Sequence, residues 1–359
     1  MLQNREKGPK APIPLTTLPP FSVHILGQNA ENKPLPIAED LSALLPAAYR
    51  DSDDNLGDPY SSDTVICSCV DQELDLNRLA EIHDWLWMAG RPIPPRPLHY
   101  QSLRGRAIQI TERMDMHLVW GNGKIFIKPI PRFLLDMRFW ELYLCCKPYE
   151  DGQHSDEQDY ARQSRYQRAY GFLFSYTALI SHESDFQLAR DKYLLPPDVE
   201  WSAWRALVRE LLCLENIFSH IDPRFYYGEL RLGRLNKIHY LYKTPFRSYE
   251  PFWNQYATFF QDNFAWLASL TVYLAVVLTA MQVGLATDAL KDDAAFHTAS
   301  YGFTVLSILG PLVFAVGMVL IFCYVFAANW IETRRFHRRR MEVIKDNIGK
   351  RLPRKAVPV

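Results

Sequence analysis

The chain has 359 residues and carries 40 Lys and Arg against 40 Asp and Glu, so its formal net charge is zero. This length allows one domain of ordinary size plus tails. The charge is unevenly placed, because the residues after Trp330 include ten basic and three acidic side chains, which leaves a net charge of −7 for the rest. An acidic body argues against nucleic-acid binding and leaves the basic end for an anionic surface.

Residues 1–63 are predicted to be a disordered segment, because prolines and aspartates recur along them. Such a composition cannot bury enough apolar surface to offset the entropy lost on ordering. The pattern also allows a short helix at Leu41–Tyr49. The segment is interpreted as a plain tether, with proline-rich binding of SH3-type partners as the alternative.

Residues 64–264 are predicted to form a cytosolic α+β domain that is mostly helical. Apolar periodicity and cap residues indicate helices over Asp75–Met88, Phe133–Cys146, Tyr160–Ile180, Asp198–Phe218 and Tyr227–Lys237. Between the first two helices, Arg91–Pro97 is predicted to be a rigid, extended, proline-rich link. The apolar stripe of the fourth helix is expected to include Trp204, Leu211, Leu212 and Phe218.

One small β-hairpin is predicted inside this domain. Three β-rich runs follow the proline-rich link, at Ala107–Thr111, Met116–Trp120 and Lys124–Lys128. Gly121-Asn122-Gly123 lies between the last two runs, and Asn-Gly between β-rich runs is a strong hairpin signal.

Two long apolar runs follow, at residues 265–287 and 303–330, and neither contains Asp, Glu, Lys or Arg. At about 1.5 Å rise per residue, the shorter run reaches ~34 Å as a helix, which is enough to cross a hydrocarbon core of ~30 Å. A two-helix transmembrane hairpin is therefore predicted. The alternative is a buried helix pair in a large soluble protein, which two uncharged runs of this length disfavour.

The basic residues predict the orientation of this hairpin. Residues 331–359 form a basic tail, whereas the short loop 288–302 is acidic and holds Lys291 as its single basic residue. Because basic residues near the ends of spans stay on the cytoplasmic side, both termini are expected to be cytoplasmic and the loop extracytoplasmic. The membrane is not specified by this pattern.

Several longer stretches carry a family resemblance. They are Trp85–Gln101, Ile110–Trp120, Ile125–Phe133, Ser184-Asp185-Phe186, Tyr227–Arg231 and Thr279–Gln282. Together they resemble an uncharacterised family of filamentous-fungal membrane proteins that contains a domain of unknown function. The resemblance covers roughly Val65 to Trp330. It implies a fungal protein with two spans, and it brings no catalytic residues.

No motif predicts an enzyme, a cofactor or a metal. Cys67-x-Cys69 offers two thiolates, but a structural zinc site needs four ligands and the sequence has no second pair. His182-Glu183-Ser184-Asp185 and His220-Ile221-Asp222 place imidazole beside carboxylate, which helix-end capping explains more simply than acid–base catalysis. A nucleophile elbow, a phosphate loop and a dinucleotide fingerprint are all missing from the sequence.

Three groups of residues are candidates for binding. The basic block after the second apolar run is predicted to attract anionic lipid, at about 1 kcal/mol per charge near the surface, through Arg334, Arg335, Arg338, Arg339 and Arg340. A second basic cluster, interpreted either as an anion or headgroup site or as solvated charge, contains Arg91, Arg96, Arg104, Arg106 and Arg113. On the first apolar run, helix packing is assigned to Ala280, Gln282 and Gly284.

These observations predict a non-enzymatic, two-pass integral membrane protein whose cytosolic domain binds lipid or a protein partner. Anionic lipids and an unidentified protein are the expected partners, with a homo-oligomer left open and nucleic acid excluded. The alternative is an oligomeric ion channel or transporter of the CorA type. Such channels carry Gly-Met-Asn after their first span, whereas this chain reads Gln282-Val283-Gly284-Leu285-Ala286-Thr287-Asp288. A membrane-bound enzyme is a third alternative, without a recognisable site.

Overall fold

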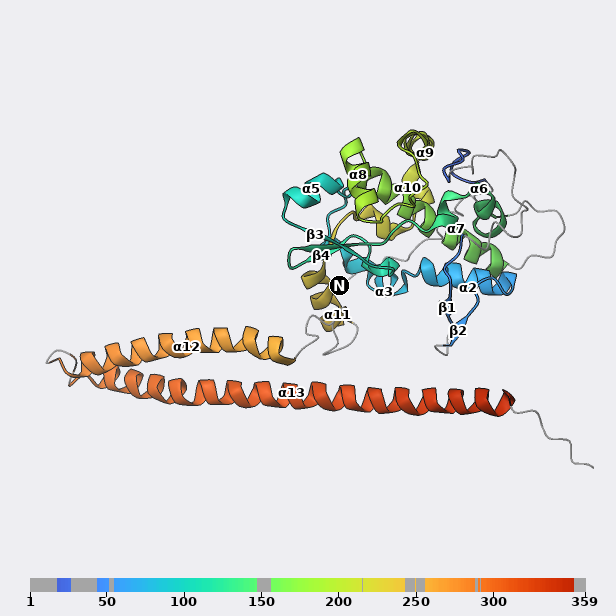
Figure 1. Cartoon of the computed structure of the whole chain (residues 1–359). Helices are drawn as coiled ribbons and strands as arrows, with labels where there is room; N and C mark the ends of the chain where they lie inside the picture. Colours follow the sequence, from blue (N-terminus) through green and yellow to red (C-terminus); the bar gives the residue numbers. More distant parts are fainter. Residues whose placement is uncertain are drawn as a thin grey trace, which may run out of the picture. The chain divides into compact units, whose positions relative to one another are not determined.

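The computed structural model describes residues 18–26, 44–51, 55–146, 156–214, 216–242, 249, 256–287, 290 and 292–351. The chain is α+β and mostly helical, as predicted (Figure 1). It divides into two compact units, Met1–Glu250 and Pro251–Val359, which are called the body and the C-terminal unit below.

The body includes more of the N-terminal segment than its composition predicts. Phe21, Ile25 and Leu44 are buried in the hydrophobic core. A short antiparallel pair follows, formed by β1 (Tyr49–Arg50) and β2 (Leu56–Gly57). The prediction of disorder up to residue 63 is therefore wrong for these described parts. Single apolar residues among the prolines pack into a core whose other residues lie far away in the sequence. The predicted helix at Leu41–Tyr49 is not formed over its described residues, and residues 41–43 lie outside the description.

Short helical turns replace the helix predicted over Asp75–Met88. The first part of the body contains α2 (Asp63–Glu73), α3 (Asn77–Ala80), η1 (His83–Trp85) and α4 (Leu86–Ala89). The side chain of Asp75 does act at a helix start, since its Oδ1 accepts a hydrogen bond from the Asn77 N–H at 2.8 Å. Leu76, Leu79, Ile82 and Leu86, which the apolar periodicity of this stretch places on one face, are buried. Apolar periodicity thus predicted the buried face of this stretch but not the points where the helix is interrupted.

A four-stranded mixed sheet extends the predicted hairpin. Its strands are β3 (Ala107–Ile110), β4 (Val119–Gly121), β5 (Lys124–Ile127) and β6 (Leu230–Arg231), in the order β3-β5-β4-β6. β4 and β5 pair antiparallel, and the turn between them places Asn122 at φ 49° and Gly123 at φ 67°, which confirms the hairpin. β3 is parallel to β5 and β6 is parallel to β4. The run predicted as a strand from Met116 begins only at Val119, after the turn η2 (Met114–Met116).

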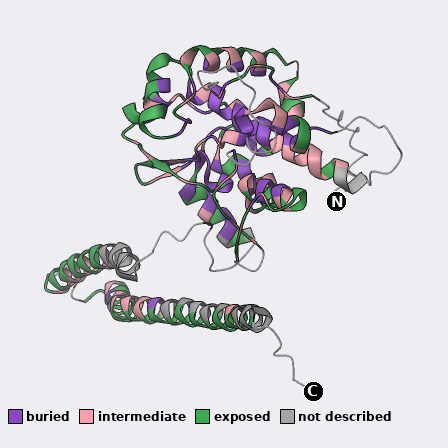
Figure 2. Ribbon diagram, turned by 45° about the vertical axis from the view of Figure 1, so that its right-hand side comes forward, coloured by how far each residue is buried: buried purple, intermediate pink, exposed green. Residues whose placement is uncertain are grey.

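Helices enclose the core beside this sheet (Figure 1). In chain order they are α5 (Leu98–Leu103), η3 (Arg132–Leu135), α6 (Met137–Phe139), η4 (Trp140–Leu144), α7 (Asp156–Leu179), α8 (Glu183–Asp191), α9 (Trp201–Cys213), α10 (Ile217–His220), η5 (Pro223–Tyr226) and α11 (Leu232–Tyr242). Figure 2 shows the buried residues gathered inside the body, with Tyr170 and Tyr176 of α7 and Trp204 of α9 among the largest. Leu212 and Phe218 are exposed, so the predicted stripe of α9 ends at Leu211.

The C-terminal unit consists of α12 (Tyr256–Leu285) and α13 (Ala294–Arg351), which contact each other. Both helices are long and apolar enough to cross a membrane, over Ala268–Leu285 and Ala294–Leu320. Large apolar side chains on them are exposed, including Val272, Val276, Leu312 and Leu320. Pro311 lies inside α13, which continues through the basic block.

Candidate anion-binding site

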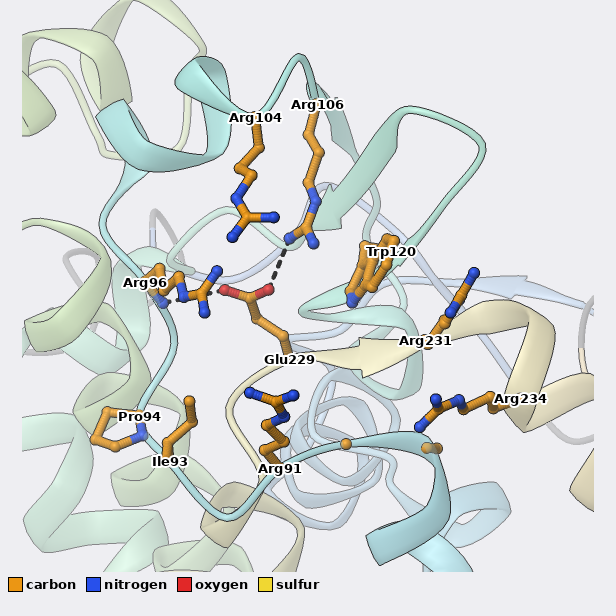
Figure 3. Close-up of a pocket in the computed structure, with 12 residues that line it drawn as sticks. Arg91, Ile93, Pro94, Arg96, Arg104, Arg106, Trp120, Glu229, Arg231 and Arg234 are labelled. Atoms are coloured by element: carbon orange, nitrogen blue, oxygen red, sulfur yellow. Dashed lines mark hydrogen bonds and ion pairs between the residues drawn. The ribbon is translucent and has the colours of Figure 1, made fainter.

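A pocket of about 310 Å³ in the body is lined mainly by arginines (Figure 3). Its residues are Ala89, Gly90, Arg91, Ile93, Pro94, Arg96, Arg104, Arg106, Trp120, Glu229, Arg231 and Arg234. The lining thus contains six guanidinium groups and one carboxylate, which gives it a net charge of +5. Figure 3 shows that the side chains of Arg91, Arg96, Arg104 and Arg106 point towards the Glu229 carboxylate from different sides.

Two chain segments that are far apart in sequence build this pocket. The proline-rich link 91–97 runs beside the segment that leads into β6, and the Gly228 N–H donates to the Ile93 carbonyl oxygen at 2.9 Å. Gly90 forms an isolated antiparallel bridge with Leu230. A side chain at position 228 would not fit, because its Cβ would lie 2.4 Å from the Ile93 oxygen and 2.5 Å from the Pro95 nitrogen. Gly228 therefore permits the close approach that brings Arg91 and Arg96 beside Glu229.

Glu229 fixes the centre of the pocket. Its Oε2 lies 2.6 Å from Arg106 Nη1, and its Oε1 accepts from Gln101 Nε2 at 2.7 Å and from the Arg96 N–H at 3.2 Å. The buried Gln101 amide also accepts from Arg106 Nη1 at 2.7 Å. Burial alone would raise the pKa of the Glu229 carboxyl, but these hydrogen bonds outweigh it and hold the pKa below its ordinary value. Glu229 is therefore ionised at neutral pH.

Aromatic rings support several of the arginines. The guanidinium carbon of Arg106 lies 3.9 Å from the centre of the Trp120 ring, and that of Arg231 lies 5.3 Å from it. Those of Arg96 and Arg104 lie 4.8 and 5.3 Å from the centre of the Tyr100 ring. Stacking of this kind restrains a guanidinium while leaving its N–H donors available.

Most of the positive charge in the pocket has no carboxylate partner. Among the residues that the structure describes, the guanidinium groups of Arg91, Arg96, Arg104, Arg231 and Arg234 form no ion pair with Asp or Glu. Tyr100 Oη accepts from Arg104 Nη2 at 2.9 Å, and this hydrogen bond lowers the pKa of Tyr100. Arg234 donates to the Met88 carbonyl oxygen at 2.9 Å. Arginine forks match the oxygens of phosphate and carboxylate, so the arrangement is suited to a multiply charged anion.

The structure gathers four of the five arginines in the cluster predicted from the sequence. Arg113 is the exception, because it pairs with Asp115 at 2.8 Å outside this pocket. Sequence reasoning missed the contributions of Trp120, Glu229, Arg231 and Arg234. Glu229 and Arg231 lie in a stretch that carried the family resemblance, but nothing in that stretch alone indicated its long-range contact with the proline-rich link.

The other predicted binding residues lie in the C-terminal unit. Within the basic block the side chains of Arg334, Arg335, Arg338 and Arg339 are exposed, and that of Arg340 is partly buried. On α12, the side chains of Ala280 and Gln282 are exposed. Gly284 meets α13 closely, since a Cβ there would lie 2.8 Å from Cζ of Phe296. Residues 352–359 of the tail and residues 288, 289 and 291 of the loop 288–302 lie outside the described residues.

The cysteines considered as zinc ligands sit in a different environment from a metal site. Cys69 is buried, and that burial raises the pKa of its thiol to about 11. Cys67 is partly buried, and both thiols are free. A thiol with a raised pKa is a poor ligand and a poor nucleophile at neutral pH.

Comparison with known proteins places the chain in a family. No curated protein and no solved structure matches it. Residues 66–311, which are more than half of the chain, match a family of unknown function, DUF6601. This confirms the resemblance to a family of unknown function, whereas the fungal origin and the two-span topology stay predictions. The chain belongs to this family, DUF6601.

Proposed function

We propose that this protein is a two-pass membrane protein whose cytosolic body binds phosphate-bearing groups in the arginine pocket. The observation that carries the proposal is a pocket lined by six arginines whose single carboxylate is already paired. The role is one of binding, and the phosphate group has two sources with the same chemistry, a lipid headgroup or a soluble phosphate ester.

The membrane part of the proposal is supported by the C-terminal unit. α12 and α13 would form the two spans, since exposed apolar side chains on both are suited to lipid. The basic block on α13 would then lie just inside the membrane, where anionic lipid is attracted to Lys and Arg. Arg334 stacks on Trp330, 5.1 Å from its ring centre, as expected for an aromatic residue near the headgroups. Both termini would be cytoplasmic.

The pocket favours phosphate over a single carboxylate for three reasons. Its volume of about 310 Å³ falls at the lower end of small-molecule sites. Five guanidinium charges without a carboxylate partner would need an anion of high charge to balance them. Several bidentate donors at different angles match the tetrahedral oxygens of phosphate groups on one ring or chain.

If α12 crosses the membrane, the body is tethered to the bilayer by the few residues of chain between Tyr249 and α12. Tyr249 precedes α12 by only a few residues and is fixed to the body, since its hydroxyl donates to Asp115 Oδ2 at 2.8 Å. Arg78 lies over the Tyr249 ring, 4.3 Å from its centre, and donates to the Tyr249 carbonyl oxygen. If α12 crosses the membrane, this anchor would hold the body within reach of lipid headgroups.

Competition in detergent micelles tests the proposal and separates the two phosphate sources. The full-length protein would be given a fluorescent short-chain phosphatidylinositol bisphosphate and then one unlabelled competitor: inositol trisphosphate, the same phosphatidylinositol bisphosphate, short-chain phosphatidylserine or phosphatidylcholine. Displacement by both inositol compounds supports a phosphate site, and displacement by the lipid form alone assigns the headgroup as the source. Equal displacement by phosphatidylcholine would contradict the proposal.

The basic block needs its own control in this experiment, because it also attracts anions. A variant with glutamine at Arg334, Arg335, Arg338, Arg339 and Arg340 should lose binding of phosphatidylserine and keep binding of inositol trisphosphate. If that variant loses inositol trisphosphate binding entirely, the tail rather than the pocket is the phosphate site.

A further inference from the structure

Two histidines and an aspartate from separate segments meet on the surface of the body, outside the arginine pocket. His99 lies in the first turn of α5, His182 precedes α8, and Asp185 lies in the first turn of α8. His99 Nδ1 is 2.8 Å from Asp185 Oδ1, and His182 Nδ1 is 3.4 Å from Asp185 Oδ2. One ligand-type atom from each residue lies within 4.8 Å of the others.

The backbone holds the carboxylate of Asp185 in place. Its Oδ1 accepts from the His99 N–H at 2.8 Å, and its Oδ2 accepts from the His182 N–H at 3.1 Å. The carboxylate is fully buried, whereas the two imidazole rings are 48% and 67% exposed, so water and ions reach the cluster from the ring side. The ring centroids are 5.4 Å apart with an interplanar angle of 82°.

Capping of α8 explains only part of this arrangement. A capping box at the start of α8 uses the Asp185 carboxylate, the backbone N–H of His182 and the His182 side chain. It needs nothing from α5. The contact of the exposed His99 imidazole with the buried carboxylate is therefore a feature that the cap leaves unexplained.

We propose that His99, His182 and Asp185 bind a divalent transition-metal ion such as Zn²⁺, with water completing its coordination. Two imidazole nitrogens and one carboxylate oxygen are a typical ligand set for zinc with an open position. On binding, the ion would take the place of the hydrogen bond between His99 Nδ1 and the carboxylate and of the 3.4 Å contact between His182 Nδ1 and the carboxylate, and each neutral ring would keep its proton on Nε2. The positive end of the α8 dipole opposes a cation, but the carboxylate charge is in direct contact and outweighs it.

Cobalt titration of the full-length protein in detergent, after removal of bound metals with a chelator, tests this site. Co²⁺ reports its ligands through visible absorption, and Zn²⁺ should displace it. The wild type should bind one Co²⁺ per chain, while His99→Ala and His182→Ala should each weaken binding by more than about tenfold. His182→Gln, whose side-chain carbonyl oxygen can still accept a hydrogen bond at the start of α8, should weaken binding equally and so separates ligand loss from disturbance of the helix start.

His220→Ala is the matched control, because His220 is a helix-end histidine two residues from Asp222 and belongs to no such ligand cluster in the described part of the chain. It should bind Co²⁺ as the wild type does. Equal affinity in all variants, or no binding above background in the wild type, would overturn the proposal. A near-ultraviolet thiolate band that disappears in Cys67→Ser would place the ion at the cysteines and also overturn it.

Discussion

Arg106 Nη1 lies 2.6 Å from Glu229 Oε2, so the single acidic group in the pocket lining is already neutralised by one of its arginines. Both side chains are largely buried, with 11% and 14% of their surfaces exposed. The pair joins the start of β3 to the start of β6, and the other guanidinium groups of the lining have no carboxylate partner among the described residues. The structure of the pocket and its charge therefore depend on the same contact.

Replacing Glu229 with glutamine should destabilise the body. Glu229→Gln leaves the buried Arg106 charge without a partner, which should lower the free energy of unfolding by about 2 kcal/mol or more. Thermal unfolding of the full-length protein, followed by tryptophan fluorescence, measures the loss. Gln101→Ala is expected to have a smaller effect, because it removes neutral hydrogen bonds and leaves the ion pair in place.

The lowered pKa of Glu229 predicts that the stability of the body depends on pH. Because the pKa of Glu229 is lower in the folded state than its ordinary value of 4.5, its contribution is complete above that value and is lost as the pH falls through the folded-state pKa. The difference in stability between the wild type and Glu229→Gln should therefore become smaller as the solution is acidified below pH 4.5. A difference in Tm between the two proteins that stays constant down to the lowest pH would contradict this assignment.

Gly228 and Gly233, five residues apart, should respond in opposite ways to alanine. In Gly228→Ala the new Cβ would meet backbone atoms of the proline-rich link, 2.4 Å from the Ile93 oxygen, and the link cannot move without shifting Arg91. We expect a loss of about 3 kcal/mol in the free energy of unfolding, together with weaker phosphate binding.

Gly233→Ala is the control for this substitution. Nothing lies within 4 Å of its would-be Cβ, and the residue is inside α11, where alanine is favoured over glycine by up to ~1 kcal/mol. Its Tm should be unchanged or higher. If both variants lose the same stability, close approach of the link is not the reason for glycine at 228.

Membrane topology is predicted from the charges around α12 and α13. Glycosylation sequons introduced into a lengthened loop 288–302 should be modified in microsomes, whereas sequons placed near Met1 or after Arg351 should stay unmodified. The readout is a mass shift that is reversed by a glycosidase. Modification near Met1 would invert the proposed orientation, and modification at no position would argue against insertion of the hairpin.

The elements that were predicted correctly from the sequence are those that local sequence patterns determine. The hairpin formed by β4 and β5 follows from Asn122 and Gly123, and the apolar helices α12 and α13 follow from runs without charge. The prediction of one continuous helix over Asp75–Met88 was wrong, because apolar periodicity indicates which face is buried and does not indicate where the helix is interrupted. Phe21 and Ile25 were assigned to a disordered segment, since composition does not show which distant core an isolated aromatic residue joins.

The arginine pocket was only half predictable for a related reason. Arg91, Arg96, Arg104 and Arg106 lie close in sequence, so the sequence predicts that they cluster. It does not predict whether their side chains contact a protein group or only water. That depends on Glu229, which reaches them through the parallel pairing of β4 with β6 and the close contact at Gly228. Pairings between segments so far apart leave no periodic signal in a single sequence.

Calorimetric titration with inositol trisphosphate tests the central claim most directly. The full-length protein in detergent should bind one molecule per chain, and Arg91→Ala/Arg231→Ala should weaken binding by more than about tenfold, since charged hydrogen bonds contribute about 1.5–3 kcal/mol each. Arg205→Ala/Arg209→Ala removes the same charge from exposed positions on α9 and should bind like the wild type. Equal weakening in both double variants would show that net charge alone attracts the ligand and would contradict a phosphate site in this pocket.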